Sequence, residues 1–132
     1  MSPPSSPLRL ALGLVDASLT RAVSRELEDV GRLTVVGDAS TSDALLGLLD
    51  HVRPDVVLAD GALVARSAGE VERRCAGLGA ALVVRVDADP RCRDVSSIEA
   101  SAFLARGPVD DMARLLLDVT MIARPRAERS RT

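Results

Sequence analysis

Six charged residues stand at or just past the ends of apolar segments of this chain. Four are aspartates and two are arginines: Asp16, Asp38, Asp60, Asp87, Arg85 and Arg106. Carboxylates grouped in this way can hold a divalent cation or accept a phosphoryl group, and guanidinium groups beside them can neutralise the negative charge. All 17 basic residues are Arg, so chemistry that requires a lysine ammonium is excluded.

The apolar segments that precede these charges have the length and composition of buried strands. Strands are expected over residues 8–15, 33–36, 56–59, 80–86 and 102–105. Helical spacing of apolar residues follows over 18–30, over the segment from Ser40, Thr41 or Ser42 to Val52, and over 108–122. The segment 62–78 is rich in alanine and broken by glycine, which predicts a loop and then a poorly defined helix. A short helix is expected near 90–99.

Strands that alternate with helices through short connections favour an α/β fold with a parallel sheet covered on both faces. The compact five-stranded version is a three-layer, flavodoxin-like (βα)5 arrangement with strand order 2-1-3-4-5. Ligands in such sheets bind outside the carboxyl ends of the strands, where the six charged residues are expected.

Length and composition indicate one globular domain. The chain has 132 residues, 47% of them apolar, and a net charge of -2. We expect a disordered segment at 1–7, the domain at 8–123 and a polar, Arg-rich tail at 124–132. No apolar run has the length of a membrane helix and the N-terminus lacks the pattern of a signal peptide, so we expect a cytoplasmic protein that does not bind membranes.

Two other site types are disfavoured by the residue pattern. Cys75 and Cys92 lack CxxC spacing and a nearby His pair, which indicates buried or bystander thiols. The tail arginines are interrupted by Pro125 and Glu128 and have no aromatic residues among them, so we expect no nucleic-acid binding within this chain.

Three segments resemble the receiver domains of bacterial response regulators, the CheY-like superfamily, in particular those that precede a helix-turn-helix in transcription factors. The segments are LRLALGLVDAS, VVGDASTSDALLGLLDHVRPDVVLAD and SAFLARGPVDDMARLLLDV. The second ends on Asp60, in the place of the family's phospho-acceptor. Residues 61–78 do not match, because the family's Met-Pro-x-x-x-Gly after the acceptor is absent.

The resemblance implies roles for five positions. Asp16 matches the first acid after the first strand, whereas Ala17 replaces the acid that binds magnesium directly. Arg85 replaces the hydroxyl residue that contacts the phosphoryl group, Arg106 replaces the lysine that pairs with the acceptor, and Phe103 matches the aromatic switch residue.

These replacements change the expected chemistry. Aspartyl phosphorylation needs a magnesium ion to neutralise charge, yet Asp16 and Asp60 supply only two carboxylates, so weak Mg²⁺ binding and no other cofactor are expected. A guanidinium at Arg85, 4 Å from Asp60, would be attracted by about 4 kcal/mol before desolvation and could occupy the place of the metal or the phosphoryl group. Arg106 keeps the lysine's positive charge. We therefore expect both arginines to reach an ionised Asp60, with Asp16 in the same pocket.

Three functions are compatible with the residues. The first is a degenerate receiver, not an enzyme, that works in signal transduction or transcriptional regulation by protein binding or dimerisation. The second is a phospho-accepting receiver of a two-component system, with Asp60 phosphorylated by a histidine kinase. The third, a flavin- or nucleotide-binding enzyme of the same fold, has little support, because the chain lacks GxGxxG and Walker patterns and has no Trp or Tyr to stack on a flavin.

The resemblance also implies a surface for association. Receivers commonly pair through their fourth helix, fifth strand and fifth helix, so a homodimer is expected at Asp94 to Glu99 and Asp110 to Arg124 of this chain. A histidine kinase or another signalling protein is expected as a further partner. Leu117 and Met121 form a small apolar patch on a face of the fifth helix distinct from its buried stripe. Arg114 and Asp118, also four apart, can border the patch or cross to a twofold mate.

Overall fold

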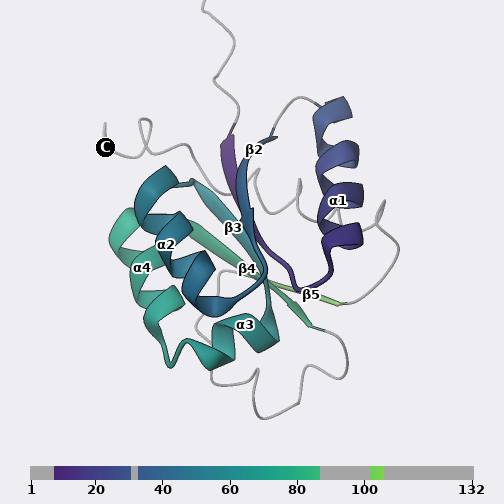
Figure 1. Cartoon of the computed structure of the whole chain (residues 1–132). Helices are drawn as coiled ribbons and strands as arrows, with labels where there is room; N and C mark the ends of the chain where they lie inside the picture. Colours follow the sequence, from purple (N-terminus) through teal and green to yellow (C-terminus); the bar gives the residue numbers. More distant parts are fainter. Residues whose placement is uncertain (1–7, 31–32, 87–101, 106–132) are drawn as a thin grey trace, which may run out of the picture.

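The computed structural model describes residues 8–30, 33–86 and 102–105 (Figure 1). The strands are β1 (Leu8–Gly13), β2 (Leu33–Ala39), β3 (Val56–Asp60), β4 (Ala81–Val86) and β5 (Ala102–Ala105). The helices are α1 (Ala17–Val30), α2 (Ser42–Val52), α3 (Gly61–Arg66) and α4 (Glu70–Leu78). None of the helices in these ranges is long and apolar enough to cross a membrane.

The strands form one parallel sheet. Strands β2, β1, β3 and β4 lie side by side in that order, which confirms the predicted order 2-1-3-4, and the short β5 pairs with β4 at the far edge. The helices predicted near 90–99 and over 108–122 lie outside the described residues. The complete (βα)5 arrangement therefore stays a prediction.

Helices pack on both faces of the sheet. Alternate residues of β1 point to opposite sides: Leu10 and Leu12 pack with Val23 and Leu27 of α1, whereas Ala11 packs on the side of α2 and α4. Figure 1 shows α1 on one side and α2, α3 and α4 on the other. Because both faces are covered, β3 is buried along its whole length, which explains its unbroken apolar sequence.

Helix α2 is held closely against the sheet. It is capped by Thr41, whose hydroxyl accepts a hydrogen bond from the amide of Ala44 at 3.2 Å, so the predicted cap is confirmed. A Cβ atom added at Gly37 would lie 2.5 Å from Cδ1 of Leu48. Glycine at this position of β2 therefore allows the close approach of α2.

The segment after β3 differs from the sequence prediction. The prediction of a loop there was wrong, because α3 begins at Gly61, directly after Asp60. Its turns bury Leu63 and Val64, a pair too short to show helical periodicity in the sequence. The helix stops at a turn in which Ala68 (φ 53°) and Gly69 (φ 87°) are left-handed, and α4 starts after it. The glycine that interrupts this segment is thus Gly69, which lies between two short helices.

A buried aspartate joins three strands at the amino-terminal edge of the sheet. Oδ2 of Asp55 accepts a hydrogen bond from the amide of Arg9 at 3.0 Å. The backbone of Asp55 also donates to the carbonyl of Arg9 at 2.8 Å and accepts from the amide of Ala81 at 2.9 Å. This residue therefore aligns the starts of β1, β3 and β4.

Replacing Asp55 by alanine should lower the free energy of unfolding by about 1–3 kcal/mol, because the part-buried amide of Arg9 loses its acceptor. Urea unfolding followed by far-UV circular dichroism measures this, since the chain has no Trp or Tyr. The matched control is Asp50→Ala, which removes a largely exposed ion pair with Arg74 and should cost less than about 1 kcal/mol. Equal losses in the two variants would contradict the role given to Asp55.

Candidate functional site

The acceptor-position aspartate lies at the carboxyl end of β3 with both carboxylate oxygens engaged. Oδ1 of Asp60 accepts a hydrogen bond from Nη1 of Arg85 at 2.8 Å, and Oδ2 accepts one from the amide of Val15 at 2.8 Å. Only 10% of the Asp60 side chain and 11% of the Arg85 side chain are exposed. The site is therefore a nearly buried ion pair with an added backbone donor.

Sheet geometry explains why these groups meet. Asp60 is directly opposite Arg85 in the register of β3 and β4, so the two side chains leave the same edge of neighbouring parallel strands. Val15 follows β1, the other neighbour of β3. The ends of three adjacent strands thus converge on one carboxylate.

Neither the Asp60 carboxylate nor the Arg85 guanidinium is stable in this site without the other. Removing a carboxylate and a guanidinium from water costs several kcal/mol for each ion, and their mutual attraction with good hydrogen bonds compensates for this cost. Loss of either partner leaves a charge in a poorly hydrated site. Arg85 therefore holds the Asp60 carboxylate in one orientation.

Asp16, predicted to share this pocket, is used at the start of α1. Its Oδ1 accepts hydrogen bonds from the amides of Ser18 at 2.8 Å and Leu19 at 3.4 Å, and its side chain is exposed. The helix begins at Ala17. Asp16 thus caps α1, which starts one residue before the helix expected over 18–30, and the group from this loop that reaches Asp60 is the amide of Val15.

The two residues directly after β1 are apolar. Leu14 is buried and Val15 is 57% exposed. Among the residues that the structure describes, no group of three or more His, Cys, Asp and Glu is placed to hold a metal ion. Within the described part of the chain, the surroundings of Asp60 do not fit the magnesium ion that the resemblance implies, because its oxygens face a guanidinium and an amide and no described neighbour adds a carboxylate.

The other predicted positions are only partly described. Asp38 lies in β2 and is exposed, so it is not part of the Asp60 site. Phe103 belongs to β5, but the structure describes only its backbone. Asp87, Arg106 and the predicted interface residues Arg114, Leu117, Asp118 and Met121 lie outside the described residues.

The described cysteine is not placed for nucleophilic chemistry. Cys75 is buried in α4, and this burial, together with the nearby charge of Glu72, raises the pKa of its thiol to about 12. The thiol is therefore protonated at neutral pH, which agrees with the prediction of a buried bystander for Cys75.

Comparison with known proteins places this geometry in a wider context. No protein-family model and no curated protein matches the sequence. The signal receiver domain of the response regulator NarL from Mycobacterium tuberculosis is similar in structure, with a TM-score of 0.70 and 24% identity over 86% of this chain and 96% of that chain. The chain has the receiver-domain fold.

Other receiver domains show the same likeness. A LuxR-family response regulator from Aurantimonas matches with a TM-score of 0.73 and 14% identity, over 91% of this chain and 89% of that one. RcsB from Salmonella enterica, bound to the promoter rprA in the presence of a phosphomimetic, matches with a TM-score of 0.72 and 14% identity, over 87% of this chain and 61% of that one. At these low sequence identities, what this chain shares with the two proteins is the receiver fold.

Replacing Arg85 by methionine should lower the free energy of unfolding by about 3–5 kcal/mol, because Asp60 would keep a buried charge without its cation. The double variant Asp60→Asn with Arg85→Met removes both charges and should recover part of that loss. Urea unfolding measures both differences.

Arg74→Met provides the matched control for this prediction. It removes a guanidinium whose partner Asp50 has 62% of its side chain exposed, and it should cost less than about 1 kcal/mol. A loss in Arg85→Met no larger than in this control would show that the buried pair does not hold the edge of the sheet together.

Proposed function

We propose that the chain is an atypical, cytoplasmic receiver domain that acts by binding another protein or a second copy of itself, without normal phosphorylation of Asp60. The observation that carries this proposal is the engagement of both Asp60 oxygens by Arg85 and Val15. The fold is that of a receiver, and the contacts of Asp60 differ from those expected of a receiver that is phosphorylated.

Phosphorylation at Asp60 requires a carboxylate oxygen that can attack phosphorus and a cation that neutralises both reacting groups. Here Oδ1 is committed to a guanidinium of fixed charge and Oδ2 to a backbone amide. Of the paired acids that the resemblance implies after the first strand, Ala17 replaces one, and the other, Asp16, caps α1. These features favour a site that is permanently charge-neutralised by its own arginine.

A permanent cation has a consequence for signalling. In a phosphorylated receiver, the modification shifts the balance between two conformations. A pair built into the sheet edge holds that balance in one position, so the domain would present the same surface at all times. RcsB, a receiver-containing protein bound to a promoter, supports transcriptional regulation as the process in which this domain works.

The second candidate is a phospho-accepting receiver, favoured by the position of Asp60 at the carboxyl end of β3. It requires Arg85 to leave the carboxylate before the reaction. A flavin- or nucleotide-binding enzyme has no comparable observation in its favour.

Incubation with acetyl phosphate and Mg²⁺, and separately with beryllofluoride and Mg²⁺, tests the proposal. We expect no phosphoryl adduct at Asp60 by mass spectrometry and no change in the amide spectrum, because the acceptor oxygens are engaged. The isolated receiver domain of RcsB, whose structure was obtained with a phosphomimetic, serves as the positive control. A phosphoryl adduct at Asp60 would select the phospho-accepting receiver instead.

We further propose that the chain forms a homodimer through the helix predicted near 90–99, strand β5 and the helix predicted over 108–122, with Leu117, Met121, Arg114 and Asp118 at the contact. Sedimentation at about 100 µM, which detects a dissociation constant worth roughly 5–6 kcal/mol, should show the same dimer with and without a phosphoryl donor. Leu117→Glu should weaken it and leave the fold intact.

The control for the dimer is Ala76→Glu, which introduces the same charge at an exposed position of α4. It should leave association unchanged. A monomer at this concentration would exclude self-association through this face and leave a different protein as the partner.

A further inference from the structure

We propose that α3 links the Asp60–Arg85 pair mechanically to the corner between α3 and α4, defined here as residues 67–73. The proposal rests on the proposed function, because it concerns how a permanent pair keeps a surface available to a partner in one form. It follows from hydrogen bonds at the two ends and in the middle of α3.

The first end of the link is Asp60 itself. It is the residue before α3, and its side chain makes no capping hydrogen bond to that helix. The carboxylate instead accepts from Val15 and Arg85. The ends of three strands therefore fix the point from which α3 starts.

The middle of the link is held by α2. Oγ of Ser42, in the first turn of α2, donates to the carbonyl of Leu63 at 2.7 Å. The side chains of Leu63 and Val64 are 2% and 1% exposed. Because a helix of six residues is not stable alone, the order of α3 depends on these contacts and on its fixed start.

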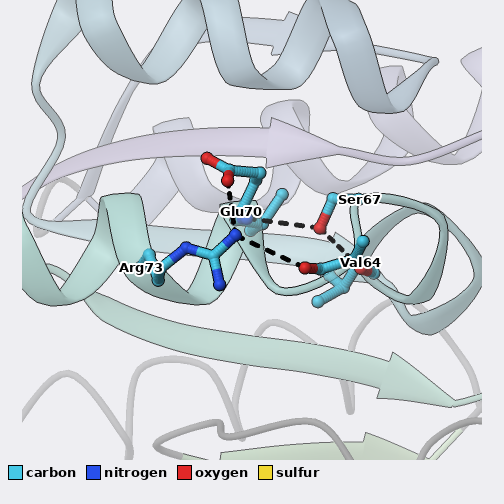
Figure 2. Close-up of polar contacts among 6 residues, drawn as sticks. Val64, Ser67, Glu70 and Arg73 are labelled. Carbon is cyan, nitrogen blue, oxygen red and sulfur yellow. Dashed lines mark hydrogen bonds and ion pairs between the residues drawn. The ribbon is translucent and has the colours of Figure 1, made fainter.

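The far end is a buried hydroxyl that joins α3 to α4. Oγ of Ser67 donates to the carbonyl of Val64 at 2.7 Å and accepts from the amide of Val71 at 3.2 Å (Figure 2). Ser67 is 7% exposed. A displacement of α3 would therefore break or strain the first turn of α4.

The outer side of the corner is exposed and charged. Arg73 pairs with Glu70 and donates to the carbonyl of Ala68 at 3.5 Å (Figure 2). The hydrogen bond and charge of Arg73 lower the pKa of Glu70. Ala68 has φ 53°, a left-handed conformation that is unfavourable for a residue with a Cβ. The turn is thus kept in a strained form by its contacts, and it would relax when α3 loosens.

These contacts predict a direction for local loosening. Loss of the Asp60–Arg85 pair should pass through α3 to the corner, because each step is covalent or hydrogen-bonded. The later turns of α1, whose Val23 and Leu27 pack in the core on the other face of the sheet, should not follow. The intact pair would in this way keep the corner in one form, although α3 lies between them.

Hydrogen exchange of the full chain, followed by mass spectrometry, tests the link. In Arg85→Met, amides of residues 61–73 should exchange at least about tenfold faster, as expected for easier local opening, while residues 23–28 of α1 stay unchanged. The double variant Asp60→Asn with Arg85→Met should show the same pattern and remains informative if the single variant does not fold. Faster exchange confined to β3 and β4, or spread evenly over the chain, would overturn the proposal.

Two further variants separate transmission from general weakening. Arg74→Met, which breaks the contact of α4 with Asp50, should leave α3 unchanged. In a Ser67→Ala background, breaking the pair should accelerate exchange in 61–66 and add no further acceleration in 70–73. Further acceleration there would show that Ser67 does not carry the coupling.

The outcome is independent of the phosphorylation test. A chain that accepts a phosphoryl group at Asp60 but shows this exchange pattern would overturn the proposed function and retain the link. A chain that refuses the phosphoryl group and lacks the pattern would retain the function and overturn the link.

Discussion

At the carboxyl edge of the sheet, the Asp60 carboxylate and the Arg85 guanidinium are both almost excluded from water and depend on each other for neutralisation. The amide of Val15 completes the arrangement, so that β1, β3 and β4 end at fixed positions relative to one another. The loop into α1 and the first residue of α3 begin at this point. The local structure on both sides of the sheet therefore depends on one ion pair.

The receiver fold brings a carboxylate to this edge, and the neighbouring residues decide what that carboxylate can do. Two apolar residues follow β1, and an arginine occupies the facing position of β4. A guanidinium carries its charge at all physiological pH values and needs no metal or phosphoryl donor to supply it. The proposed interaction module is the consequence: a scaffold that is shared with phosphorylated regulators but has a cation built into its sequence.

Much of this could be predicted from the sequence, and the failures have physical causes. Buried parallel strands have long apolar runs, which identified β1, β3 and β4, and the placement of Arg85 and Asp60 at the ends of neighbouring strands predicted their contact. Asp16 and Ser18 are both good helix caps, so the pattern could not decide between them. The amide of Val15 has no sequence signature because any residue except proline supplies it. Helix α3 was missed because its buried pair is shorter than one period of a helix.

The pair also changes what genetic experiments on Asp60 would report. Alanine in its place would leave Arg85 in a nearly buried site without its carboxylate, and glutamate would push a longer side chain against the Val15 amide. The effects of both variants would reflect damage to the edge of the sheet. A phenotype at this codon would therefore measure protein abundance and integrity before it measured signalling.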